Sequence, residues 1–147
     1  MDHARSRLCS SLFLFAFILV AADGGLGQGG SGLFGSPTPY GSGGYGSDSV
    51  AIADVNGDGK PDLIVANACI AYVGCSTGAV GVLLGNGDGT FQPAVSYGSG
   101  GQTAESVALA DLNGDGKLDI VVANQSGTVG VLLNNGDGTF QSAVPYS

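Results

Sequence analysis

The feature that most constrains the fold is an internal repeat. Residues 49–67 return 57 positions later, at 106–124, with mostly conservative changes. A second shared stretch, 80–92, returns only 49 positions later, at 129–141. The first unit therefore carries an eight-residue insertion between its two shared stretches. Because the two units share these stretches, each is expected to build the same supersecondary structure.

Both units predict short strands. The chain has 28 glycines in 147 residues and no tryptophan, and its apolar residues stand in short runs of Val, Ile, Leu and Ala. Asn86-Gly87 and Asn135-Gly136 are typical of tight hairpin turns between such runs. The predicted strands are 49–53, 62–67, 79–84, 91–96, 106–110, 119–124 and 128–133, and an eighth that starts at 140. This pattern predicts an all-β fold of four-stranded antiparallel sheets, the architecture of propeller blades.

Composition and the repeat together divide the chain into segments. An uncharged stretch, 8–22, follows Arg5 and Arg7, which indicates a secretory signal peptide, and the stretch is short for a membrane anchor. The expected segments are a signal peptide at 1–22, a flexible Gly/Ser-rich leader at 23–32, a first repeat at 33–89, a second repeat at 90–138 and the start of a truncated third repeat at 139–147.

Each repeat contains one acidic loop, at 54–62 and at 111–119. Oxygen-bearing side chains fall at positions one, three, five and nine of the loop, and a glycine at position six permits a sharp turn. Ca²⁺ takes six to eight oxygen ligands in a flexible geometry, so this spacing predicts one calcium ion in each loop. The candidate ligands are Asp54, Asn56, Asp58, the Lys60 carbonyl and Asp62, then Asp111, Asn113, Asp115, the Lys117 carbonyl and Asp119.

Two alternatives to this calcium loop are weaker. An EF-hand loop requires a bidentate glutamate at position twelve, where this chain has Val65 and Val122. A plain turn explains a lone Asp-Gly pair, but three carboxylates packed into one loop repel each other unless a cation screens them. For Asn86-Gly87 and its counterpart at Asn135, a hairpin turn is explanation enough.

Charge and cysteine content restrict the partners. The net charge is −8, and removal of residues 1–22 takes away one acid and two bases, which leaves −9. This balance argues against nucleic acid and against an anionic membrane surface as partners. Cys69 and Cys75 lie in the insertion, and export to an oxidising compartment favours a disulfide between them, although two free thiols remain the alternative.

The run from Val50 to Asp62, followed by the run from Gly85 to Gln92, resembles the FG-GAP or VCBS repeats found in the propeller blades of integrin α-subunits. The resemblance covers about residues 33–147. It implies calcium in both acidic loops, held by the ligands named above, and a role in adhesion or ligand recognition. Such propellers close with about seven blades, so two blades and a fragment predict an incomplete propeller. Further blades in a longer chain, or self-association, would be needed to complete it.

The predicted function is that of a secreted or cell-surface calcium-binding module, without enzymatic activity, that binds an unknown protein or glycan ligand. The only histidine, His3, lies in the expected signal peptide, so Ser-His-Asp and histidine-containing metal sites are excluded after cleavage. No membrane insertion is expected after that cleavage. The alternatives are a structural spacer or vestigial fragment without a ligand, and an accessory region of a larger secreted enzyme.

Overall fold

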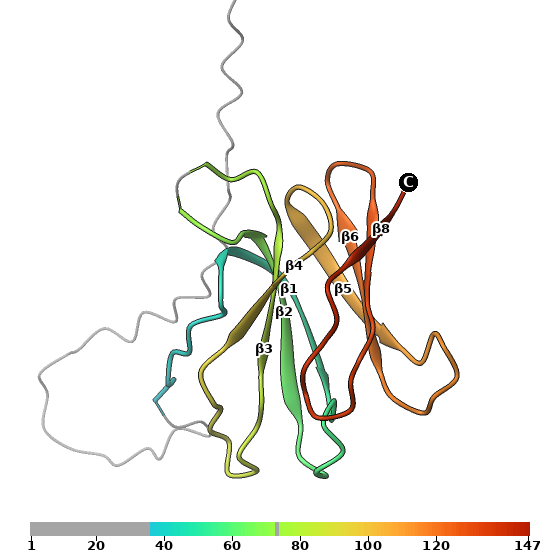
Figure 1. Ribbon diagram of the computed structural model, residues 1–147. Coiled ribbons are helices and arrows are strands. Elements are labelled where there is room, and N and C mark those ends of the chain that lie inside the picture. The colour runs from blue at the N-terminus through green and yellow to red at the C-terminus, as the bar shows by residue number, and fades with distance from the viewer. Residues whose placement is uncertain (1–35, 73) are drawn as a thin grey trace, which may run out of the picture. The chain divides into compact units, whose positions relative to one another are not determined.

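In the computed structural model, the described residues, 36–72 and 74–147, form two four-stranded antiparallel sheets (Figure 1). The first sheet contains, in spatial order, β1 (Tyr45–Ala53), β2 (Asp62–Cys69), β3 (Ala79–Leu83) and β4 (Val95–Gly98). The second contains β5 (Ala104–Ala110), β6 (Asp119–Asn124), β7 (Val129–Leu132) and β8 (Val144–Tyr146). The predicted all-β fold is confirmed. Both sheets are consistent with propeller blades, and the described residues form no closed ring.

Burial along the strands explains why these runs are strands. All five residues of β3 are buried, and a continuous apolar run without alternation is typical of a strand covered on both faces. The end of β1 alternates instead: Val50 and Ile52 are exposed, whereas Ala51 and Ala53 are half-buried. Because successive side chains point to opposite faces of a sheet, only one face of β1 is covered here.

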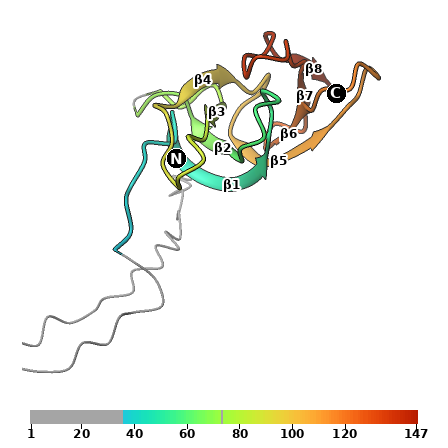
Figure 2. The same cartoon turned by 90° about the horizontal axis from the view of Figure 1, so that it is seen from below.

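The hydrophobic core lies between the two sheets, where β5 packs against β1 and β2 (Figures 1 and 2). The pairing registers place one set of core residues on a single face of the first sheet, namely Ala51, Ala53, Ile64, Ala66, Val80 and Val82. The facing residues of the second sheet are Val107, Leu109, Ile120, Val122 and Leu132.

The fourth strand of each sheet lies later in the chain than predicted. The predictions were 91–96 and a start at 140, whereas β4 is Val95–Gly98 and β8 is Val144–Tyr146. The residues before each strand are used to close a turn: Gln92 N–H donates to the Leu84 carbonyl at 2.8 Å, and Gln141 N–H donates to that of Leu133 at 2.8 Å. The chain therefore joins the sheet only after leaving the turn.

Some predictions lie wholly or partly outside the described residues. The signal peptide at 1–22 and the leader at 23–32 fall there, as do the first residues of the repeat expected at 33–89. The two sheets span 45–98 and 104–146, and the repeat boundaries proposed from the sequence stay predictions. Over 36–72 and 74–147, the structure contains no helix with the length and apolar character needed to cross a membrane.

Candidate functional site

The first acidic loop, 54–62, joins β1 to β2 and curls around the side chain of Asp54. The Asp54 carboxylate accepts the backbone N–H groups of Gly57 at 2.7 Å, Asp58 at 3.2 Å and Gly59 at 2.8 Å. Gly57 and Gly59 have φ of +77° and +81°, a region that side chains rarely adopt. The glycines thus permit the tight curl, and Asp54 fixes it.

The second acidic loop, 111–119, repeats this geometry between β5 and β6. Asp111 accepts the N–H groups of Gly114 at 2.7 Å, Asp115 at 3.1 Å and Gly116 at 2.9 Å. In each loop the amide oxygen at position three accepts the N–H at position five, at 3.1 Å in the first loop and 2.9 Å in the second. The nearly identical sequences thus fold to nearly identical loops.

The carboxylates at position nine, Asp62 and Asp119, are fully buried and accept backbone N–H groups. Asp62 accepts from Val55 at 2.9 Å and from Gly85 at 2.8 Å, so it ties the acidic loop to the turn that follows β3. Asp119 does the same in the second sheet, accepting from Leu112 at 3.0 Å and Asn134 at 2.9 Å. The loop spacing predicts these aspartates as calcium ligands and gives no sign of this structural role.

The lysines at position seven bring a positive charge to each loop. Lys60 Nζ lies 3.3 Å from Asp58 Oδ2, and Lys117 Nζ lies 3.7 Å from Asp115 Oδ2. The backbone N–H of Lys60 donates to Asp58 and lowers the pKa of that carboxyl, and Lys117 acts likewise on the pKa of Asp115. Both exposed carboxylates are therefore ionised at neutral pH.

The donor atoms of each loop fit a hard cation by their chemistry. Asp54, Asn56 and Asp58 offer carboxylate and amide oxygens within five residues, and each Asp62 oxygen accepts one hydrogen bond, which leaves it further acceptor capacity. Nevertheless, no group of three or more Asp, Glu, His or Cys side chains in the described chain is arranged to hold a metal ion. The predicted calcium ligands consequently remain predictions.

Asn134 links the first acidic loop to the second sheet. Its Nδ2 donates to the Val55 carbonyl at 2.8 Å and to the Leu118 carbonyl at 2.9 Å. The equivalent position in the first repeat is Gly85, which has no side chain to make such a bond. The replacement of Gly85 by Asn134 at aligned positions of the two repeats is the sequence signal that could have pointed to a specific role for Asn134.

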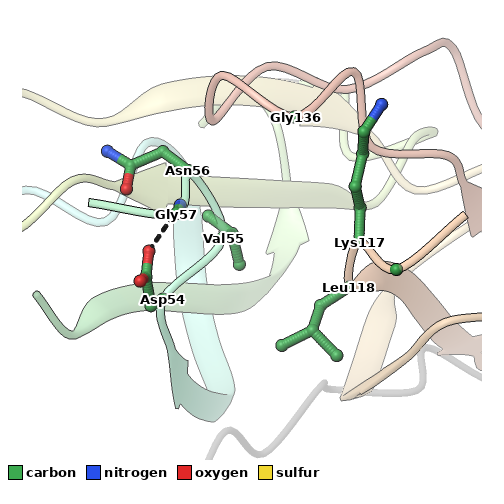
Figure 3. A pocket seen from close by; sticks show the side chains of 8 residues that line it. Asp54, Val55, Asn56, Gly57, Lys117, Leu118 and Gly136 are labelled. Atoms are coloured by element: carbon green, nitrogen blue, oxygen red, sulfur yellow. Dashed lines mark hydrogen bonds between the residues drawn. The ribbon is translucent and has the colours of Figure 1, made fainter. Parts of the chain in front are cut away.

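A small open hollow lies between the two acidic loops (Figure 3). Asp54 and Asn56 of the first loop stand on one side of it, and Lys117 and Leu118 of the second loop stand on the other. The hollow is mixed in charge and open to solvent.

Hydrogen bonds within the turns that follow β3 and β7 hold the aspartates of these turns. In the first, Asp88 Oδ1 accepts from the backbone N–H of Thr90 at 2.9 Å and from its hydroxyl at 2.6 Å. The Asn86 side-chain amide donates to that hydroxyl at 2.8 Å. The turn at Asn135 repeats these contacts, so hydrogen bonding within each turn accounts for the aspartate.

The insertion of the first repeat projects from the end of β2. Cys69 and Cys75 are joined by a disulfide with a Cα–Cα distance of 5.1 Å, which lies in the usual range. Tyr72 is 83% exposed, and its ring lies 5.6 Å from that of Tyr45. This pair of tyrosines is the aromatic feature that distinguishes the first repeat from the second.

Comparison with known protein families gives one match that covers most of the chain. A family model described as "FG-GAP-like repeat" matches residues 19–65, 70–122 and 111–147. No curated protein and no solved structure matches the chain.

Proposed function

The chain belongs to the FG-GAP-like repeat family, and from this premise we propose that it is a secreted, calcium-stabilised repeat module that binds a ligand without catalysing a reaction. The observation that carries the calcium proposal is the duplicated loop. Asp54 and Asp111 each gather three backbone N–H groups, and the same pattern of Asn and Asp side chains surrounds both. In this proposal, Asp54, Asn56 and Asp58 hold Ca²⁺ in the first loop, with the Lys60 carbonyl and Asp62 completing the set.

Secretion is supported by the N-terminal sequence and by the cysteines. An apolar stretch after Arg5 and Arg7 is typical of a signal peptide. The disulfide between Cys69 and Cys75 is of a kind that persists in oxidising compartments.

The absence of catalysis in this proposal is supported by the cysteines and by the histidine content. A disulfide-bonded cysteine is not a free nucleophile, and the sole histidine, His3, lies in the expected signal peptide. Recognition of a protein or glycan ligand is assigned to the insertion, because exposed tyrosines such as Tyr72 offer an aromatic surface with a polar tip.

Calcium titration tests the metal proposal. We expect isothermal titration calorimetry to give two Ca²⁺ ions per chain, one ion for Asp58→Ala, and none for Asp58→Ala combined with Asp115→Ala. At a free calcium concentration about 100 times Kd, each site should add about 2.7 kcal/mol to the free energy of unfolding, because only the folded state offers the site.

The matched control is Asp88→Ala, which removes an exposed aspartate from a turn to which the proposal assigns no metal. This variant should keep both calcium ions. A thermal melt of the unmodified chain that chelator leaves unchanged, together with no heat of calcium binding, would refute the proposal.

A further inference from the structure

The two sheets carry equivalent faces with different surroundings. Each residue of the first sheet has an equivalent in the second sheet, 57 or 49 positions later in the chain. By this equivalence, the face of the first sheet that packs on the second sheet corresponds to the outward face of the second sheet, which points away from the first. The outward residues are Ala108, Ala110, Val121, Ala123, Val129 and Val131. In the first sheet, the equivalent side chains belong to the core.

The exposed fractions show how different the two surroundings are. Val80 is fully buried, whereas its counterpart Val129 is 41% exposed. Val55 is 3% exposed, whereas its counterpart Leu112 is 50% exposed. The second sheet thus presents to solvent an apolar surface that, in the first sheet, another sheet covers.

The β1 part of the complementary half of this interface is also exposed, whereas the counterparts Val65 and Leu83 on β2 and β3 are buried. Val107 and Leu109 of β5 face the first sheet in the core. Their counterparts on β1, Val50 and Ile52, are 57% and 66% exposed on the far face of the first sheet. One chain therefore exposes the outward face of the second sheet and, on β1, the part of the first sheet that corresponds to the strand packed against that kind of face inside the chain.

We propose that a second copy of this chain docks its β1 face, Val50 and Ile52, onto the outward face of β5 and β6. The contact reproduces between copies the packing that β5 makes with β1 and β2 within one copy. Because the two faces differ, the association is head-to-tail, and each added copy leaves one face of each kind free. Tyr97 of the first sheet contacts Phe140 of the second sheet, and the second-sheet equivalent of Tyr97 is Tyr146. In a docked copy, the equivalent of Phe140 is Phe91, which Tyr40 of that same copy already contacts. Tyr146 therefore takes no part in the contact between copies.

Two surface variants test the arrangement by sedimentation velocity in calcium-containing buffer. Ile52→Lys blocks the β1 face, and Ala123→Lys blocks the outward face of the second sheet. We expect the unmodified chain to form species of two or more copies as its concentration rises, and each variant alone to sediment as one copy. An equimolar mixture of the two variants should form two-copy species and nothing larger, because each variant retains the face that the other lacks.

The control Gln141→Lys adds the same charge at an exposed position outside both faces and should associate like the unmodified chain. Val129→Lys is a second variant of the outward face, and far-ultraviolet circular dichroism establishes that each variant folds. A chain that stays a single copy at every concentration would overturn the proposal. The outward face would then be covered by the chain's own residues 1–38 or by a different partner. Association that survives Ile52→Lys would also overturn it, since contact between two second sheets or through residues 8–22 does not need Ile52.

Discussion

The two sheets have nearly the same strands but different surroundings. Features that they share follow from their similar sequences, and features that differ follow from what packs against each sheet. The first sheet is covered on one face by β5, and residues 40–44 cover part of its other face, where Tyr40 contacts Phe91 and Asn67 Nδ2 donates to the Ser42 carbonyl at 3.0 Å, whereas Val50 and Ile52 stay exposed there. In the described part of the chain, the second sheet is covered only where it faces the first. Local geometry is the same in both sheets, whereas burial is not, so burial depends on the neighbour.

The largest expected difference between the sheets concerns a pair of equivalent glycines. An added Cβ at Gly130 would collide with the Ser99 carbonyl oxygen, and one at Gly81 would collide with that of Ser42. Ser99 is buried in the link between β4 and β5, so it moves only if the two sheets separate. Ser42 is only half-buried and lies ahead of β1 in a segment without a strand, so it is less constrained than Ser99 even though Asn67 Nδ2 donates to its carbonyl.

We therefore predict that Gly130→Ala lowers the free energy of unfolding by about 3 kcal/mol and Gly81→Ala by about 1 kcal/mol. Urea denaturation of both variants measures the difference. Equal losses would mean that residues 40–44 hold the first sheet as firmly as the inter-sheet link holds the second.

A second pair tests the burial difference directly. Val55→Ala removes a buried side chain from the core and should cost about 2 kcal/mol, because it loses apolar burial and leaves a cavity. Leu112→Ala removes a larger side chain from an exposed site and should change stability by no more than about 0.5 kcal/mol.

Denaturation at a concentration where the chain is a single copy measures both values. A large loss for Leu112→Ala under these conditions would show that the outward face of the second sheet is covered within one chain. The comparison of the two sheets would then need a different explanation.

Most of the fold followed from the repeat and from strand patterning, because both are local properties. The acidic loops were located for the same reason, since their curl depends on residues within the loop, such as Gly57 and Gly59. The bracing role of Asp62 was not predictable from spacing. Its partner Gly85 lies 23 residues away, and spacing within a loop says which atoms can accept hydrogen bonds but not which donors reach them.

The displaced fourth strands have a related cause. The strand expected at 91–96 was read from apolar residues after a turn, but the backbone of Gln92 closes that turn. Pro93 is not the reason, because the second sheet shows the same displacement with Ser142 at the equivalent position. A pattern of strand-forming residues therefore does not reveal which residues are held back by hydrogen bonds within the preceding turn.

The smallest expected effect is a pH dependence shared by the two acidic loops. The backbone N–H of Lys60 lowers the pKa of Asp58, and that of Lys117 lowers the pKa of Asp115. A carboxyl with a lowered pKa in the folded state stabilises that state above its unfolded pKa of about 4, and this contribution disappears as the pH falls through the folded value.

In metal-free buffer, the melting temperature should therefore be flat from pH 7 to 5 and fall below pH 4. Asp58→Asn and Asp115→Asn should weaken this acid dependence slightly and equally, since both carboxylates are exposed and each accepts the backbone N–H of the lysine two residues later. Thermal melts between pH 2 and 7 would measure it. A distinctly larger change for Asp58→Asn would show that the neighbouring sheet alters the electrostatics of the first loop as well as its burial.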